Sequence, residues 1–304
     1  MPKEVAFYLN CKHGKIYADC TLGGSGHAKD ILTKILPDGL LIGIDQDKDA
    51  IENAKTVFNR HAINVQLFHG NFILLSEFLS QLNINKIDGI LLDLGLSLHQ
   101  LQASGRGFSF LKDEPLDMRM NVLSKIKAKD IVNQMDEAGL KKIFKVYGEE
   151  PHAFNIARKI VKVRKQKAIA SSKQLSEIVC DAIPNKSIRK RKNHPATKVF
   201  MSLRIVVNKE LERLNSFLDD AVNYLNPHGR LCVLSFHSLE DRIVKNKFRT
   251  WAKECICPPY FPQCVCKKEK IVQILTKKVI MSSKDEIAFN PMSRSARLRA
   301  VEKI

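Results

Sequence analysis

The stretch Asp19–Leu32, DCTLGGSGHAKDIL, decides the fold of this 304-residue chain. Positions 23, 24 and 26 are glycines, and they lie between two apolar runs. The run GKIYADCTLG predicts a strand that ends in the glycine turn, and HAKDILTKIL has apolar residues at helical spacing. Because glycine has no Cβ, the backbone of such a turn approaches a ligand closely, and the helix N-terminus behind it favours negative charge. The stretch therefore predicts a nucleotide-binding turn.

The residues that follow, up to Gly95, alternate between short apolar runs and amphipathic segments. Strands are expected at LLIGIDQD (40–47), NVQLFHGNF (64–72) and KIDGILLDLG (86–95), and helices at KDAIENAKTVFNRH (48–61) and LLSEFLSQLN (74–83). This order is typical of a parallel sheet covered by helices. In such sheets ligands bind beyond the carboxyl ends of the strands.

The middle of the chain has a different pattern. Residues 101–192 contain helical patterns, such as AFNIARKIVKVRKQ (153–166), and no convincing strand. One long helix is expected over 195–225, followed by a strand at GRLCVLSF (229–236) and a further strand within IVQILTKKVI (271–280). We therefore predict an α/β core of residues 1–101 and 193–304, a doubly wound sheet, interrupted by a helical insertion of residues 102–192.

The chain is strongly basic, with 50 Lys and Arg against 32 Asp and Glu, a net charge of +18 and a pI near 9.6. Between Arg158 and Lys192 there are 12 bases and only two acids, Glu177 and Asp181. This charge favours a nucleic-acid partner. The alternative is a solvated basic surface on a lysine-rich protein. A second basic patch is expected at Arg294, Arg297 and Arg299.

The sequence favours a cytoplasmic protein with no membrane contact. No apolar run approaches the ~20 residues needed to span a bilayer. The N-terminus, MPKEVAFYLNCKHG, does not have the pattern of a signal peptide. The cysteines do not form a secreted disulfide framework, so a reducing compartment is expected. Nothing in the sequence decides the oligomeric state.

Four of the eight cysteines crowd into CICPPYFPQCVC, as the two C-x-C pairs Cys255, Cys257 and Cys264, Cys266. Four thiolates hold zinc tetrahedrally. The usual C-x-x-C spacing is absent, so the alternative is a set of reduced cysteines in a proline-stiffened loop. No other metal site is expected.

The nucleotide motif is neither of two common ones. A dinucleotide fingerprint that starts at Gly24 requires Gly or Ala at position 29, which is Lys29, and no Walker A loop is present. The missing glycine argues against a nucleotide-binding oxidoreductase. Asp45 ends the second strand and is placed to bind both ribose hydroxyls, and Asp93 ends the fourth. A glycine turn with a ribose-binding acid and no pyrophosphate site fits S-adenosylmethionine better than NAD. The alternative is that Asp45 and Asp93 only cap helices or begin turns.

Several long motifs resemble one family. They are TLGGSGH, DGILLDLG, RGFSF, PLDMRM, YGEE, HPATK, LRIVVNKEL, SFHSLEDRIVK and NPMSRSARLRA, in family order. The chain resembles the ribosomal RNA small-subunit methyltransferase H family, also called MraW. The resemblance implies a Rossmann-like, S-adenosylmethionine-dependent methyltransferase fold with a helical insertion that recognises RNA. It also implies methylation of the exocyclic N4 amine of a cytidine in the decoding region of small-subunit ribosomal RNA.

The resemblance also implies a cofactor pocket. Its residues would be Ser25, Gly26 and His27 of the glycine turn, Asp45 on the ribose, Phe72 beside the adenine, and Asp93 and Gln100. Without the resemblance, the residue type of Phe72 favours a position in the apolar core. The family commonly has LGVSS before its Gln, whereas this chain has LGLSLHQ. Cysteine clusters occur in some family members only, so catalysis is not expected to depend on them.

The amine of cytosine is a poor nucleophile, because its lone pair is delocalised into the ring. The enzyme must orient the amine in line with the methyl group and accept its hydrogens. We expect Asp93 to be this acceptor as well as a cofactor contact. His237, in VLSFHSLEDR, either relays a proton or has a structural role at a strand end. The alternative function is a non-catalytic RNA-binding ribosome-assembly factor that has kept the fold.

Overall fold

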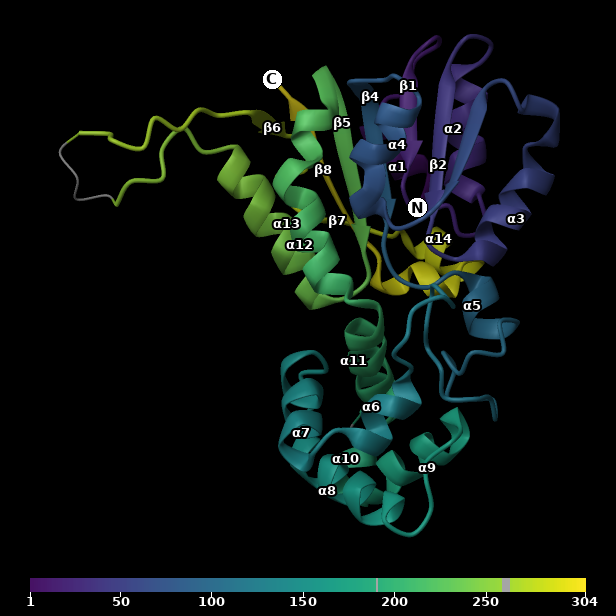
Figure 1. The fold of residues 1–304 in the computed structure, drawn as a ribbon. Coiled ribbons are helices and arrows are strands. Elements are labelled where there is room, and N and C mark those ends of the chain that lie inside the picture. Colours follow the sequence, from purple (N-terminus) through teal and green to yellow (C-terminus); the bar gives the residue numbers. More distant parts are fainter. Residues whose placement is uncertain (190, 259–262) are drawn as a thin grey trace. The chain divides into compact units, whose positions relative to one another are not determined.

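The computed structural model describes residues 1–189, 191–258 and 263–304 (Figure 1). The chain divides into two compact units. Unit 1 comprises Met1–Gly95 and Leu211–Ile304, and unit 2 comprises Leu96–Glu210. Within the described residues, no helix combines the length and the apolar character that a membrane crossing requires.

Unit 1 is built on one eight-stranded sheet. Its order is β3-β2-β1-β4-β5-β8-β6, and β7 also pairs with β8. The strands are β1 (Ile16–Asp19), β2 (Leu40–Asp45), β3 (Val65–His69), β4 (Ile87–Asp93), β5 (Leu225–Ser235), β6 (Val272–Ile274), β7 (Ile280–Met281) and β8 (Arg297–Lys303). β1 to β5 are parallel, and β8 runs antiparallel to β5, β6 and β7. The parallel strands confirm the predicted α/β, Rossmann-like fold.

Helices cover both faces of this sheet (Figure 1). They are α1 (Pro2–Leu9), α2 (Gly26–Ile35), α3 (Lys48–Val57), α4 (Leu75–Gln81), α12 (Glu210–Asp220) and α13 (Ser238–Trp251). A further short helix, α14 (Lys284–Phe289), has no buried residue. Leu41 of β2 packs in one core with α1, α2 and α3, while its neighbour Ile42 packs in the other with α4, α12 and α13. Successive side chains of a strand point to opposite faces, so short, wholly apolar runs form these strands.

Unit 2 is helical and has one apolar core of its own. Its helices are α5 (Leu98–Gln102), α6 (Ala128–Gln134), α7 (Glu137–Val146), α8 (Ala153–Arg164), α9 (Ser172–Ala182), α10 (Asn185–Arg189) and α11 (Thr197–Asn208). The unit extends beyond the predicted insertion of residues 102–192. The reason is that Val199, Phe200 and Leu203 of α11 are buried in the core of unit 2.

The single helix expected over 195–225 is wrong. α11 ends at Asn208, and Lys209 adopts a left-handed conformation with φ 51° before α12 begins at Glu210. The N–H of Lys209 donates to the carbonyls of Ile205 and Val206, which closes the last turn of α11. Two helices therefore replace one, although the apolar spacing runs through both.

The end of the chain also differs from expectation. The expected strand within 271–280 is β6, whereas the short strand β7 that begins at Ile280 and the strand β8, which contains Arg297 and Arg299, were not expected. The Arg299 guanidinium donates to both carboxylate oxygens of Asp241, at 2.6 and 3.2 Å, and Arg297 lies 3.6 Å from the same carboxylate. The charge of these two bases is thus paired within unit 1, which argues against the second predicted RNA patch.

Candidate active site

Three carboxylates end three neighbouring strands of unit 1. Asp19 ends β1, Asp45 ends β2 and Asp93 ends β4, and β1 lies between the other two strands. Because the strands are parallel, their carboxyl ends share one edge of the sheet. The chain thus gathers residues from positions 19, 45 and 93 at one place, as the sequence predicted for Asp45 and Asp93.

The glycine turn follows β1 directly. Gly23 and Ser25 have positive φ angles of 47° and 65°, and α2 begins at Gly26. A Cβ built on Gly24 or Gly26 meets no atom within 4 Å, so the turn borders open space. The Ser25 hydroxyl is buried and has no hydrogen-bond partner within the described part of the chain. A buried hydroxyl beside open space is suited to a polar ligand.

Asp45 is held by the turn that it faces. One carboxylate oxygen accepts from the N–H of Gly23 at 2.8 Å, and the other accepts from the N–H of Asp47 at 2.8 Å. Each oxygen of a carboxylate has two acceptor sites, so each keeps one for a ligand hydroxyl. Burial raises the pKa of Asp45 to about 6, although these two hydrogen bonds oppose the shift. The arrangement suits a pair of vicinal hydroxyls, such as those of a ribose.

Asp19 and Asp93 flank the same turn. Burial raises the pKa of each carboxyl to about 7, and their mutual repulsion adds to the shift at Asp19. Asp19 is 1% exposed and accepts from the N–H of Thr21 at 3.1 Å. The side chain of Asp93 is 30% exposed, and its Oδ1 is buried without a hydrogen-bond partner among the described residues. Asp93 therefore offers a free acceptor that changes charge near neutral pH.

His27 lies beside Asp93, with 3.7 Å between His27 Nε2 and Asp93 Oδ2. Burial lowers the pKa of His27 to about 4. The imidazole is therefore neutral at pH 7, and the two side chains do not form an ion pair there. Their proximity places His27 in the predicted group, as a neutral polar wall.

Phe72 is 8% exposed and packs edge-on against Phe217, with ring centroids 5.3 Å apart. Its neighbour Asn71 donates to the side-chain oxygen of Gln46 at 3.0 Å, and Arg213 donates to the same oxygen at 2.8 Å. This polar chain connects the ends of β2 and β3 to α12. Because the Phe72 ring is buried against Phe217, it is mainly a core side chain, as its residue type alone indicates.

Gln100 lies in unit 2, whereas the other predicted cofactor residues lie in unit 1. Its side-chain oxygen accepts from the N–H of Ser97 at 3.1 Å, and the Ser97 hydroxyl accepts from the N–H of Gln100 at 3.2 Å. This reciprocal pair is the capping box of α5. A structural role therefore occupies at least part of the Gln100 side chain.

His237 is the N-cap of α13. Its Nδ1 accepts from the N–H of Glu240 at 3.4 Å, and the Glu240 carboxylate accepts from the N–H groups of Phe236 and His237. Its Nε2 lies 3.1 Å from Glu240 Oε1. These contacts cap the N-terminus of α13, so they support the structural role considered for His237.

The whole chain, residues 1–304, matches the MraW methylase family. The chain belongs to this family. Among its relatives is the Ribosomal RNA small subunit methyltransferase H of Desulfosudis oleivorans, 52% identical over 304 residues, which are 100% of this chain and 97% of that protein. The protein of the same name from Clostridium botulinum strain Loch Maree is 50% identical over 302 residues, 99% of this chain and 97% of its own length.

This MraW methylase is a methyltransferase that uses S-adenosylmethionine. The site fits that cofactor on three observations of unit 1. The turn at Gly24 and Gly26 borders open space, the Ser25 hydroxyl has no partner among the described residues, and Asp45 keeps one acceptor site on each oxygen. A cofactor with a polar amino-acid end and a ribose supplies groups for all three.

Sequence reasoning did not name Asp19, Gln46 or Arg213 as site residues. Asp19 is buried and ends the strand before the glycine turn. Its place directly before this turn is the one local feature of the sequence that could have marked it as a site residue. Gln46 follows Asp45 directly, but its bond to Arg213 joins residues 167 positions apart. No local pattern indicates a contact of that span.

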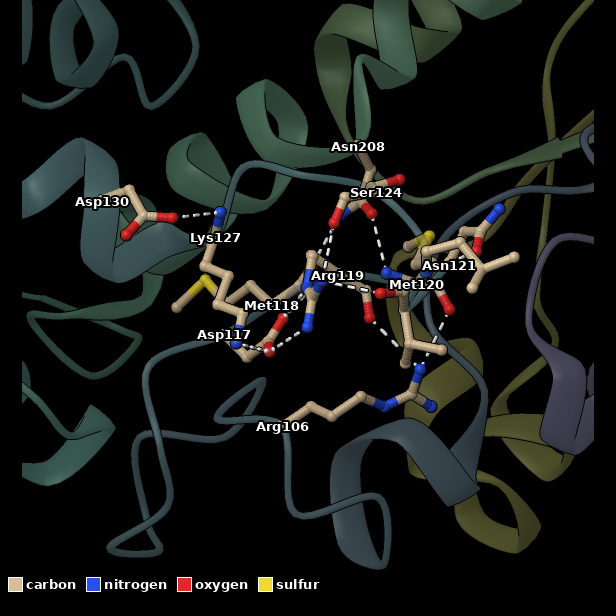
Figure 2. A network of polar contacts seen from close by, with 12 residues as sticks. Arg106, Asp117, Met118, Arg119, Met120, Asn121, Ser124, Lys127, Asp130 and Asn208 are labelled. Atoms are coloured by element: carbon tan, nitrogen blue, oxygen red, sulfur yellow. Dashed lines mark hydrogen bonds and ion pairs between the residues drawn. The ribbon is translucent and has the colours of Figure 1, made fainter.

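Unit 2 brings together three of the motifs quoted in the sequence analysis, as Figure 2 shows. The Arg119 guanidinium donates to both oxygens of Asp117, at 2.6 and 2.8 Å. Burial opposes ionisation of Asp117, but these bonds hold its pKa below the ordinary value. Arg106 donates to the carbonyl of Met120 at 2.9 Å, and Asn208 accepts from the N–H of Met120 at 2.8 Å. The RGFSF, PLDMRM and LRIVVNKEL motifs thus form one structural network.

Proposed function

We propose that this MraW methylase methylates the N4 amine of a cytidine in the decoding region of small-subunit ribosomal RNA. The family is that of a methylase, and the relatives reported above carry the name of a small-subunit ribosomal RNA methyltransferase. The observation that supports the chemistry best is Asp93. It combines an unbonded, buried carboxylate oxygen with a pKa near 7 at the carboxyl end of β4.

In the proposed site, Ser25, Gly26, His27 and Asp45 hold the cofactor. S-adenosylmethionine, when bound, supplies an electrophilic methyl group on its sulfonium. Transfer of this methyl group would join its carbon to the cytidine nitrogen, release the demethylated cofactor and leave one amine proton to be accepted. Asp93 Oδ1 accepts a hydrogen of the amine, which orients its lone pair and stabilises the positive charge that develops on nitrogen.

A carboxylate whose pKa lies near neutrality is a suitable proton acceptor, because it is ionised before the transfer and binds a proton afterwards at little free-energy cost. Asp93 meets that condition because burial raises its pKa to about 7, although the nearby N-terminal ammonium group opposes the shift. In this proposal Phe72 and Gln100 stabilise the structure around the site and do not take part in the reaction. The contacts described above give Phe72 a place in the core of unit 1 and Gln100 a capping role in unit 2.

We assign RNA binding to unit 2. Its basic stretch, residues 158–192, has eight exposed bases in the described part of the chain: Arg158, Lys162, Lys165, Lys167, Lys173, Lys186, Arg189 and Lys192. Exposed Lys and Arg side chains bind phosphates and release counterions. Small-subunit ribosomal RNA, within the subunit, supplies the phosphates in this proposal.

Besides Lys159 and Arg164, which are only partly exposed, two bases of this stretch are set aside. Lys190 lies outside the described residues. Arg191 donates to both oxygens of the buried Glu150 carboxylate, at 2.5 and 2.9 Å, and these bonds hold the pKa of Glu150 below its ordinary value despite the opposing effect of burial. Arg191 is therefore assigned to the fold of unit 2, and variants that probe RNA binding should leave it intact.

The test supplies radiolabelled S-adenosylmethionine and the purified chain to small subunits from cells that lack the enzyme. We expect one labelled cytidine in the decoding region, with the label on N4 and dependent on Asp93. A label on another base or another atom contradicts the proposed specificity. RNA binding with no label at all, from protein that binds the cofactor, favours the non-catalytic assembly factor instead.

A further inference from the structure

The segment between α13 and β6 carries a cluster of four cysteine sulfurs. The Sγ atoms of Cys255, Cys257, Cys264 and Cys266 all lie within 4.8 Å of one another. Cys264 Sγ is 3.5 Å from both Cys255 Sγ and Cys266 Sγ, and Cys255 and Cys266 are 3.8 Å apart. The two C-x-C pairs thus converge, although the chain between them contains six residues.

These spacings correspond to a metal site better than to disulfides. Four sulfurs placed about 2.3 Å from one zinc ion lie at tetrahedral corners about 3.8 Å apart. A disulfide needs sulfurs about 2.05 Å apart, and all four cysteines are free thiols here. The observed separations lie close to the tetrahedral edge and far from a covalent bond.

Backbone amides also point at the sulfurs. The N–H of Cys257 donates to Cys255 Sγ at 3.3 Å, that of Val265 to Cys257 Sγ at 3.4 Å, and that of Ile256 to Cys266 Sγ at 3.5 Å. A hydrogen bond to an ionised acceptor is stronger than one to a neutral acceptor. Amides directed at three of four sulfurs therefore favour the thiolate form, which is the form that binds metal.

The described residues of this segment form no apolar core that would hold it in this shape. No described residue from Ala252 to Ile271 is buried, and the apolar side chains of Ile256 and Val265 are 56% and 68% exposed. In Figure 1 the chain that follows α13 and the chain that leads into β6 both extend away from the sheet of unit 1. A short chain without a core commonly depends on a metal or a disulfide for its structure.

We propose that Cys255, Cys257, Cys264 and Cys266 bind one Zn²⁺ ion as a structural site. Thiolate ligands select zinc over Mg²⁺ or Ca²⁺, and four protein ligands leave no open position for a catalytic water. Binding replaces the thiol protons with the metal and releases them to solvent. The site lies outside the residues assigned to the cofactor, so the ion orders the segment and takes no part in methyl transfer.

The test measures the metal content of the full-length protein, purified under reducing conditions without chelator. We expect about one zinc per chain, as for a closed four-cysteine site. The double variant Cys255→Ser/Cys264→Ser should lose at least nine-tenths of that zinc. The matched control Cys180→Ser, a cysteine of unit 2 outside the cluster, should keep all of it.

Cobalt substitution gives a second readout. The wild-type protein with Co²⁺ should show thiolate-to-metal charge-transfer bands and the d–d bands of a tetrahedral site, and the double variant should show neither. Calorimetric titration with S-adenosylmethionine checks that the variant is still folded. Absence of zinc together with absence of a cobalt spectrum overturns the proposal. So does stoichiometric iron in place of zinc, or a mass that shows disulfides among these cysteines.

Discussion

The proposed role of Asp93 predicts that the activity of this MraW methylase depends on pH. Its pKa is raised to about 7, and only the ionised carboxylate accepts a hydrogen of the amine in the proposed mechanism. We therefore expect kcat/KM for the RNA, at saturating cofactor, to fall about tenfold per pH unit below pH 7 and to level off above it. Asp93→Ala should abolish transfer. A flat profile between pH 6 and 8, or near-normal turnover of Asp93→Ala, contradicts the assignment.

Asp45 should determine cofactor affinity. Asp45→Asn replaces one carboxylate oxygen by an NH₂ group, which faces a backbone N–H donor and cannot accept a ribose hydroxyl. Lost charge-assisted hydrogen bonds of ~2–3 kcal/mol correspond to a roughly 30- to 150-fold weaker Kd. Calorimetric titration with S-adenosylmethionine measures the change.

The matched control is Asp88→Asn, at the other end of β4. Asp88 also accepts a backbone hydrogen bond, from Ile16 at 3.0 Å, but it lies away from the glycine turn. Its variant should lose stability without losing cofactor affinity. Equal effects of the two variants on Kd would contradict a direct contact between Asp45 and the ribose.

Asp19 makes the stability of the cofactor-free protein depend on pH. Its pKa rises from 3.8 to about 7 on folding, because burial disfavours the charge. Between those values the folded state binds more protons than the unfolded state, so the free energy of unfolding falls as pH rises. Asp19→Asn has no proton to lose. Its stability relative to wild type should increase by up to about 4 kcal/mol between pH 4 and pH 7.

Urea denaturation of both proteins across that pH range measures the difference. The Asn side chain still offers an oxygen to the N–H of Thr21, so the local hydrogen bond is conserved. A stability difference that stays constant with pH would show that the Asp19 carboxyl does not titrate in this window.

At the scale of elements, the border between α11 and α12 explains why one predicted helix is two. Periodicity reports which faces are apolar and is continuous across residues 195–225. It does not report that Asn208, by donating to the carbonyls of Met118 and Arg204, fixes the end of α11. The partner Met118 lies 90 residues away in the sequence. Long-range hydrogen bonds of this kind leave no local signal.

Lys209→Gly should therefore stabilise the protein. Lys209 has φ 51°, a conformation that costs most residues about 1 kcal/mol relative to glycine. We expect the free energy of unfolding to rise by ~0.5–1 kcal/mol. Glu212→Gly, at an exposed position inside α12, should lower it by about the same amount. Denaturant midpoints compare the two, and a loss of stability in Lys209→Gly would contradict the proposed break.

Strand β8 shows a different limit of sequence reasoning. Its first four residues, RLRA, alternate between bases and apolar side chains, and Leu298 and Ala300 are buried. The arginines looked like an RNA patch because a charge count does not reveal pairing. In the fold, Arg299 pairs with Asp241 of α13, and Glu302 of β8 accepts from Arg230 of β5 at 2.8 Å. The charges join elements of unit 1.

At the scale of the whole molecule, the sequence predicted most of what local chemistry determines. Short apolar runs that end in acids defined β1, β2 and β4, and the glycine turn defined the start of α2. Asp45 and Asp93 followed from those strand ends. The extent of unit 2 did not follow, because the core that absorbs α11 is assembled from residues distant in the sequence. The basic stretch 158–192 was visible, but its internal pairing was not.

The pairing of Arg191 with Glu150 separates bases that stabilise the fold from bases that are free to bind RNA phosphates. Lys186, Arg189 and Lys192 are exposed, whereas Arg191 is bound to Glu150. Replacing the three exposed bases with serine should weaken RNA binding and reduce the slope of log affinity against log salt by about 2, since each phosphate contact contributes roughly 0.7. Cofactor affinity should not change.

The matched control replaces Lys48, Lys55 and Arg60, exposed bases on the α3 side of unit 1, and should leave the slope unchanged. Equal losses in both triple variants would mean that total charge, and not unit 2, governs RNA binding.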